Sequence, residues 1–149
     1  MDLNLYNKQI LRLAASMSRA GRLEDPDASA SAHSRVCGSR ITVDIMLDGD
    51  VITDYAHELR ACAIGQAVAS VVAEVIVGLT VADVGKGERI LTAILKDKAP
   101  PQPGPWTKLE PFLSVADYHN RHDSALLPFK ALQKAIAEAD NMAVHPHRI

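Results

Sequence analysis

Two cysteines are the side chains of this sequence that are best suited to chemistry. Cys37 comes just before a stretch that alternates between apolar and polar residues, and Cys62 opens a helix-length apolar run. A thiolate is both a nucleophile and a soft metal ligand, and a helix N-terminus stabilises it, so Cys62 is the better thiolate candidate. The alternative is that Cys62 belongs to the core, because cysteine is among the most often buried residue types.

A polar cluster directly ahead of the last predicted helix offers further ligands. It consists of Arg121, His122, Asp123 and Ser124. His122 supplies a nitrogen donor and Asp123 an oxygen donor, whereas Asp123 or Ser124 can equally be a helix N-cap with no further function. The sequence shows no paired cysteines at zinc-site spacing, no glycine-rich phosphate loop and no paired-histidine metalloprotease motif. The residues alone therefore leave a metal site and a structural role both open.

Two strands and a buried helix are expected to position these residues. The segments 41–47 and 51–56 are rich in β-branched residues, and Gly49 between them can adopt the positive φ of a tight turn, which predicts an antiparallel hairpin. The apolar run 62–77 is expected to be a helix that covers the hairpin. The predicted fold class is therefore α+β, with a small antiparallel β-sheet packed against several helices.

The remaining segments complete this arrangement. The segment 21–35 has no clear periodicity and is expected to be a loop, which can also supply a third strand before Cys37. Four prolines make 99–106 an exposed connector. Further helices are predicted over 3–17, from the capping box of Thr80 and Asp83 toward Asp97, over 109–118 and over 124–139.

Length and composition predict a single globular domain and limit the partners that are expected for it. The 149 residues divide into a helix and loop arm at about 1–36, a core at 37–140 and a frayed tail at 141–149. The net charge of −2 disfavours nucleic acid and anionic membranes as partners. The longest uncharged apolar run falls short of the roughly 20 residues that a bilayer crossing needs, and the N-terminus has no signal-peptide pattern. We therefore expect a cytoplasmic protein with reduced cysteines and no membrane partner.

Three segments, taken in order, carry a family resemblance. They are Cys37-Gly38-Ser39 ahead of a hairpin with Asp48-Gly49, Ala61-Cys62-Ala63-Ile64-Gly65 at the start of an alanine-rich helix, and Arg121-His122-Asp123-Ser124-Ala125-Leu126-Leu127-Pro128-Phe129-Lys130-Ala131-Leu132. Together they resemble the U-type iron–sulfur cluster assembly scaffold family, the group of IscU, SufU and the NifU N-terminal domain. The resemblance implies a SufE/NifU-like sandwich fold.

The same resemblance implies a site and its partners. Cys37 and Cys62 correspond to ligands for iron or a [2Fe–2S] cluster, and Asp123, His122 and Ser124 are further candidate metal ligands. A cysteine desulfurase would supply sulfur and recipient apo-proteins would accept the product, so the protein would be a scaffold and not an enzyme. This chain departs from the family pattern at Ser124, where a cysteine is expected, and at Ser39, where an aspartate is expected. Asp123 likewise replaces a histidine or lysine.

The departures leave three functional alternatives. The first is the scaffold-like protein, in which two cysteines are too few for the four ligands of a [2Fe–2S] cluster, so that a homodimer could share one cluster. The second is a zinc-dependent sulfur acceptor similar to SufU, in which a thiolate attacks the persulfide of a desulfurase. The third is an interaction protein that has kept the fold and lost the site. A brown, cluster-loaded protein would distinguish the first from a colourless zinc protein.

Overall fold

The computed structural model describes residues 7–35 and 38–144 of the chain. Part of the helix predicted over 3–17, Cys37 and the end of the predicted tail lie outside the described residues. The elements follow one another in the order α1 (Lys8–Ala15), β1 (Ala28–His33), β2 (Arg40–Asp48), β3 (Val51–Arg60), α2 (Ala63–Val75), α3 (Val81–Asp97), η1 (Thr107–Val115), η2 (His119–Arg121) and α4 (His122–Val144). The predicted α+β class is confirmed.

The three strands form one antiparallel sheet in the order β1-β2-β3. The predicted hairpin is present, and Gly49 in its turn has a φ of +61°. Ile41, Val43 and Ile45 of β2 are buried on one face of the sheet, as the alternation predicts. β1 is the third strand that the segment before Cys37 was expected to be able to supply, and the loop prediction over 21–35 is wrong only for residues 28–33. Alternating Ala and Ser have low strand propensity, and pairing with β2 overrides it.

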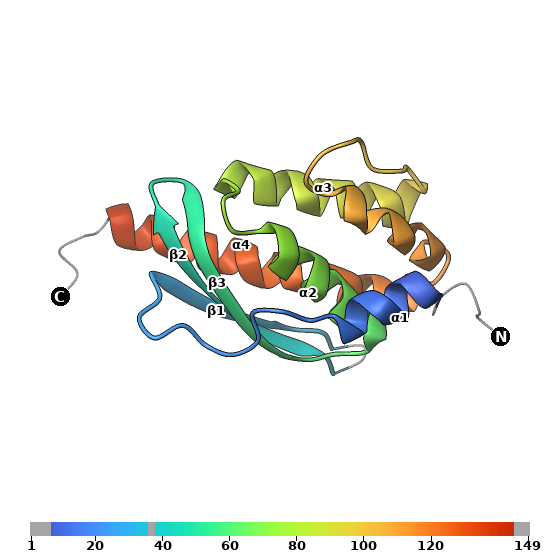
Figure 1. Ribbon diagram of the computed structural model, residues 1–149, viewed down its shortest axis with the longest axis horizontal. Coiled ribbons are helices and arrows are strands. Elements are labelled where there is room, and N and C mark those ends of the chain that lie inside the picture. Colours follow the sequence, from blue (N-terminus) through green and yellow to red (C-terminus); the bar gives the residue numbers. More distant parts are fainter. Residues whose placement is uncertain (1–6, 36–37, 145–149) are drawn as a thin grey trace.

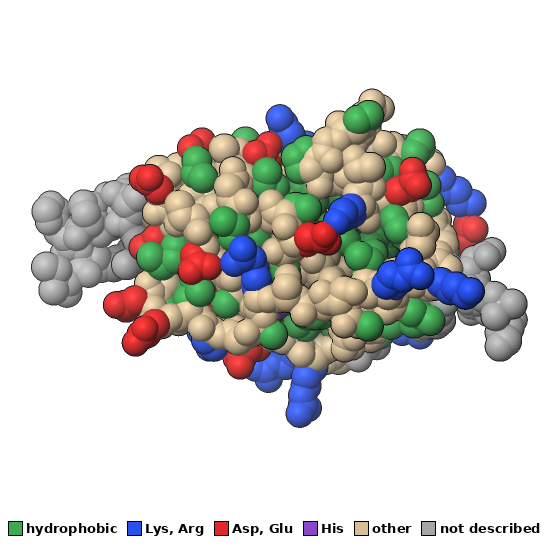
Figure 2. Space-filling model, in the orientation of Figure 1, with side chains coloured by type: hydrophobic (Ala, Val, Ile, Leu, Met, Phe, Trp, Pro, Cys, Tyr) green, Lys and Arg blue, Asp and Glu red, His purple; other side chains and the backbone are tan. Residues whose placement is uncertain are grey.

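The helices cover one face of this sheet (Figure 1). The element α2 packs over β3, α4 packs over β1 and β2, and α3 with η1 lies beyond them. Ile64 and the run from Ala67 to Ala73 of α2 are buried, which confirms a helix enclosed on most sides. Figure 2 shows acidic and basic side chains interspersed over the face of the molecule that is visible in this orientation, with hydrophobic side chains in small groups.

Two predicted helical segments differ in detail from the structure. The segment predicted as a helix over 109–118 is the 3-10 helix η1, which contains Pro111. Pro111 has no N–H to donate, so the backbone hydrogen bond that an α-helix would form from this position is missing. The last helix, α4, begins at His122 and continues to Val144, four residues into the segment predicted to be a tail.

The capping box and a buried tryptophan hold α3 in place. Thr80 and Asp83 exchange the two predicted hydrogen bonds, at 3.0 and 3.1 Å, so this capping prediction is confirmed. Trp106 ends the connector that was expected to be exposed, yet only 2% of its surface is accessible. Its Nε1 donates to the carbonyl oxygen of Asp83 at 2.9 Å, and its ring packs edge-to-face on Phe129.

The α1–β1 segment, residues 16–27, is fastened to the sheet by two buried polar residues. On the outer face, the Asp44 carboxylate accepts hydrogen bonds from the Arg22 guanidinium, the Leu23 N–H and the Ser29 hydroxyl. On the inner face, buried His57 bonds through Nε2 to the carbonyl oxygen of Ser18 at 2.9 Å. This segment is therefore an anchored part of the fold.

Candidate functional site

Cys62 is the N-cap residue of α2. It has extended backbone angles, φ −66° and ψ 170°, and follows the end of β3 at Arg60 by two positions. Its side chain makes no capping hydrogen bond and is partly buried. The sulfur therefore stands at the helix start, as the sequence predicts, and is available to groups from other elements.

Two serines approach Cys62 from distant parts of the chain. Ser124 lies in the first turn of α4, and its Oγ is 3.3 Å from the Sγ of Cys62. The Oγ of Ser39, just before β2, is 3.3 Å from the Oγ of Ser124. Both serines are buried, Ser124 completely. We call Ser39, Cys62 and Ser124 the Ser–Cys cluster; it forms at the end of the molecule where α2 and α4 both begin (Figure 1, right).

Gly65 makes this approach feasible. A Cβ at this position would lie 2.9 Å from the Oγ of Ser124 and 2.9 Å from the Cβ of Ala61, closer than real Cβ atoms come to their neighbours. The absence of a side chain therefore lets α4 bring Ser124 against the first turn of α2. In the sequence Gly65 stands out only as the last residue of the second family motif, although a glycine inside an otherwise Ala-, Val- and Ile-rich helix is also a signal of close packing.

The other predicted ligands have their contacts elsewhere. His122 bonds through Nε2 to the carbonyl oxygen of Ala116 at 3.0 Å, and its ring lies 5.1 Å from that of His119. Asp123 is half-exposed and forms an ion pair with Lys130 at 3.7 Å. Across residues 7–35 and 38–144, no three His, Cys, Asp or Glu side chains come together as a metal-binding group, so Cys62, His122 and Asp123 do not converge.

The Ser–Cys cluster supplies one soft donor and two neutral hydroxyls. The hydroxyls can donate hydrogen bonds to a sulfur anion, but an uncharged alcohol is a poor substitute for a thiolate ligand. Zinc takes four N, S or O donors, so the described members of the cluster do not by themselves fit a zinc ion. Cys37, the other predicted thiol, lies outside the described residues.

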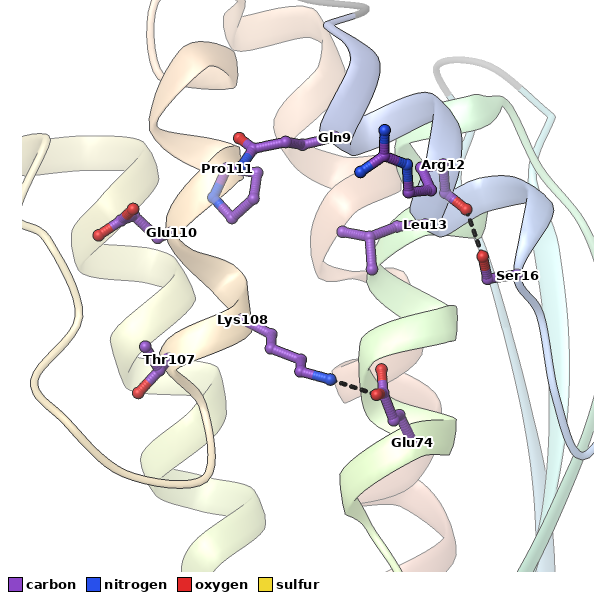
Figure 3. Close-up of a pocket in the computed structure, with 9 residues that line it drawn as sticks. All are labelled: Gln9, Arg12, Leu13, Ser16, Glu74, Thr107, Lys108, Glu110 and Pro111. Atoms are coloured by element: carbon purple, nitrogen blue, oxygen red, sulfur yellow. Dashed lines mark hydrogen bonds and ion pairs between the residues drawn. The ribbon is translucent and has the colours of Figure 1, made fainter.

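A separate cavity of about 410 Å³ lies between α1, α2 and η1 (Figure 3). Leu13 and Pro111 face it, and Lys108 spans it to form an ion pair with Glu74. None of the predicted site residues lines this cavity. None of the helices in the described ranges is long and apolar enough to cross a membrane.

Two curated proteins resemble this chain in sequence. The zinc-dependent sulfurtransferase SufU of Bacillus subtilis is 26% identical over 136 residues, which cover 91% of this chain and 92% of SufU. The iron–sulfur cluster assembly scaffold protein IscU of Thermotoga maritima is 31% identical over 80 residues, which cover 54% of this chain and 56% of IscU. The names of the two relatives correspond to two of the three functional alternatives, the scaffold and the zinc-dependent sulfur acceptor.

Solved structures agree with the sequence relatives. The N-terminal NifU-like protein from Brucella abortus, described as nitrogen-fixing, superposes with a TM-score of 0.89 at 39% identity, covering 93% of this chain and 96% of the other. A candidate iron–sulfur cluster assembly scaffold for the SUF system from Fervidobacterium islandicum has a TM-score of 0.82 at 25% identity, covering 90% and 98%. The family model of the NifU-like N terminal domain matches residues 5–139. The chain therefore belongs to the NifU-like N-terminal domain family, which confirms the resemblance found in the sequence.

Proposed function

We propose that this protein is a scaffold-like component of iron–sulfur cluster assembly that binds iron or a [2Fe–2S] cluster as its cargo through Cys37 and Cys62. Family membership supports the general role. The observation that carries the assignment of the site is the contact between Cys62 and Ser124, residues 62 positions apart whose segments both match family motifs. A cysteine desulfurase is the proposed sulfur donor, and apo-proteins are the proposed recipients.

Chain connectivity limits how far Cys37, the second proposed ligand, can be from the Ser–Cys cluster. Cys37 is two residues before Ser39, and consecutive Cα atoms are about 3.8 Å apart. Ser39 itself is a buried member of the Ser–Cys cluster. These facts support a site made from the loop before β2 and the start of α2.

The number of thiols sets the proposed stoichiometry. Each chain contains two cysteines, and a [2Fe–2S] cluster takes about four protein ligands, mostly thiolates. Neutral serine hydroxyls do not replace the missing thiolates. We therefore propose one cluster shared between two copies of the chain, each of which contributes Cys37 and Cys62.

Anaerobic reconstitution with ferrous iron and sulfide tests this proposal. The expected product absorbs visible light and contains one [2Fe–2S] unit per two chains. In size-exclusion chromatography it elutes as a dimer, whereas protein without a cluster elutes later, as a smaller species. Cys37→Ala and Cys62→Ala should each abolish loading, and the exposed Ser31→Ala on β1 is the matched control that should load normally. Equal iron and sulfide content in all four proteins would exclude the two cysteines as ligands.

A zinc-dependent sulfur acceptor is the second candidate. It is favoured by the match to SufU, which extends over 91% of this chain. In this role one thiol of the chain would take the transferable sulfur from a desulfurase persulfide, and the desulfurase thiol would be the leaving group. We place this candidate second because Ser124 offers a neutral alcohol next to Cys62, where an additional anionic zinc ligand would be needed.

The two candidates predict different metal contents. Protein purified without chelators is analysed for zinc, iron and acid-labile sulfide, and then incubated with a cysteine desulfurase and free cysteine. A sulfur acceptor carries about one zinc per chain and stimulates sulfide release in a Cys62-dependent manner. A scaffold carries little zinc and accumulates iron and sulfide together.

A further inference from the structure

A row of basic side chains crosses the sheet beside the Ser–Cys cluster. Arg40 on β2 is the register partner of His33 on β1 and of Arg60 on β3. All three are exposed. Their strand positions are opposite in parity to buried Ile41 and partly buried Leu59, which pack toward the core, so the row lies on the outer face, away from the helices. We call these three residues the basic row.

The basic row is not required by the fold. Like charges directly opposite each other on neighbouring strands are destabilising, and Arg40 faces Arg60 in this way. Among the ion pairs formed by the described residues, none involves either arginine. Arg40 and Arg60 are therefore exposed register partners that form no ion pair with another described residue, which is an arrangement that an anionic ligand stabilises.

The surface around the basic row is hollowed. A cavity of about 410 Å³ is lined by Gly38, Arg40, Thr42, Glu58, Leu59 and Arg60. Among the described residues of this lining Glu58 is the only acidic one, and it lies one outward position before Arg60 on β3. The cavity therefore presents two guanidiniums together with a hydroxyl and one carboxylate.

The cavity and the Ser–Cys cluster share the same short connections. β2 begins one residue after Ser39, and β3 ends two residues before Cys62. A molecule held by Arg40 and Arg60 is thus positioned at the edge of the region where Cys62 is available. A docking contact here would bring the partner's reactive or receiving group close to the thiol.

We propose that the basic row is a docking site for an acidic segment, rich in Asp or Glu, of a partner protein that exchanges cargo at the Ser–Cys cluster; this rests on the proposed function. Charge complementarity identifies the occupant. The chain as a whole has a net charge of −2, so its overall field does not attract an acidic segment. Binding of such a segment must arise from the local arrangement of His33, Arg40 and Arg60.

A fluorescent hexaglutamate peptide is the probe for this site. Its anisotropy is measured on the full chain at low salt and during a salt titration, because contacts between exposed charges weaken as ions screen them. Wild-type protein is expected to bind it, and Arg40→Glu with Arg60→Glu is expected to weaken binding about tenfold or more. The matched control is Lys86→Glu with Arg89→Glu on α3, which makes the same change in net charge and should retain wild-type binding.

Two further measurements decide among the remaining outcomes. Inorganic phosphate at the same ionic strength as a chloride reference should displace the peptide no better than chloride; selective displacement would assign the row to a free oxyanion and overturn the proposal. Equal peptide binding by wild type and the Arg40/Arg60 double variant, or none by wild type, would also overturn it. Anaerobic cluster loading of the double variant should equal that of wild type. Failure of the wild-type protein to load a cluster would count against the proposed function, and the peptide measurement tests the docking site separately.

Discussion

At the scale of single residues, the buried hydroxyl of Ser124 occupies the point where a third thiol would complete the proposed site. Its Oγ contacts both the Sγ of Cys62 and the Oγ of Ser39. A hydroxyl at this position can hydrogen-bond to sulfur but contributes no charge to a metal or cluster. In the proposed site, the identity of this one atom is therefore expected to set how strongly a soft cation is held.

Ser124→Cys is expected to raise the affinity of the protein for iron, zinc or a cluster. The substitution replaces a neutral oxygen by a soft, ionisable sulfur beside Cys62. Metal titration should show at least about a tenfold increase in affinity, the usual scale of effect when a ligand or its support is changed. Ser31→Cys on the exposed face of β1 is the matched control, and Cys62→Ala should cancel the gain. An unchanged affinity that is also independent of Cys37 would mean that these positions do not form one site.

Asp44→Asn is expected to lower the free energy of unfolding by about 1–3 kcal/mol. Both Asp44 oxygens accept hydrogen bonds, so the new amide NH₂ must face a donor from Arg22, Leu23 or Ser29. Chemical denaturation measures the change. The control is Asp54→Asn, because Asp54 is half-exposed and its ion pair with Arg19 at 3.5 Å contributes little. Equal losses in the two variants would show that the buried carboxylate does not anchor residues 16–27.

At the scale of elements, small residues determine how closely helices approach. Gly65 admits Ser124 to the start of α2, and Gly87 admits the ring of Trp106 to α3. A Cβ on Gly87 would lie 2.5 Å from the Trp106 ring and 2.8 Å from Phe129. A Cβ on Gly85, two residues earlier in the same helix, would have its nearest neighbour, the Arg89 guanidinium, at 3.4 Å. The two glycines of α3 therefore have different roles.

Gly87→Ala and Gly85→Ala are expected to change stability in opposite directions. The first forces two aromatic rings apart and should destabilise by about 1–3 kcal/mol. The second replaces a poor helix former without a clash and should stabilise by up to about 1 kcal/mol. Thermal unfolding of the two variants against wild type provides the measurement. Stabilisation by both substitutions would mean that Trp106 can leave its position on α3 at little cost.

At the scale of the whole molecule, the α1–β1 segment ties the first helix to the sheet and protects a sheet edge. The N–H of Gly21 donates to the carbonyl oxygen of His57 at 2.8 Å, and the N–H of His57 donates to that of Arg19 at 3.1 Å. These bonds pair backbone groups on the outer edge of β3 that would otherwise be open to another chain. His57 also bonds through its ring to Ser18 and Tyr55, so it is the centre of this attachment.

Acidification is expected to weaken the fold through His57. Burial lowers the pKa of His57 below its ordinary value of 6.5, although the bond to the Ser18 carbonyl opposes this shift. The folded protein therefore takes up the proton less readily than the unfolded chain, and the stability from neutral His57 is complete above about pH 6.5 and is lost as the pH falls toward the lowered pKa. The free energy of unfolding, measured by chemical denaturation between pH 7.5 and 5, should fall with decreasing pH by at most about 1.4 kcal/mol per pH unit.

The matched variant for this pH dependence is His57→Gln. It removes the titrating group while keeping a side chain that can hydrogen-bond to Ser18 or Tyr55. Its unfolding free energy should be lower than that of wild type at pH 7.5 and should change less between pH 7.5 and 5. Identical pH profiles for the two proteins would assign the acid sensitivity to other groups. The pKa of Asp44 is held low by the bonds that outweigh its desolvation, so that carboxylate acts only at a more acidic pH.

The sequence by itself determined the local elements and the family. Hairpin alternation over 41–47, the apolar run from Cys62 and the Thr80–Asp83 capping box depend on neighbours within about one turn or one strand pair, and all three appear as predicted. The three ordered motifs were specific enough to identify the family that residues 5–139 match. Such features are encoded by contacts at short sequence separation, which a pattern can reveal.

Only the tertiary structure decided which distant residues meet. The contact of Cys62 with Ser124 and the dependence of that contact on Gly65 come from the packing of α2 against α4. The strand β1 likewise exists because β2 offers its edge, although Ala and Ser disfavour strands on their own. Helix crossing and strand pairing join residues far apart in the chain, and a periodicity within one segment carries no information about the partner segment.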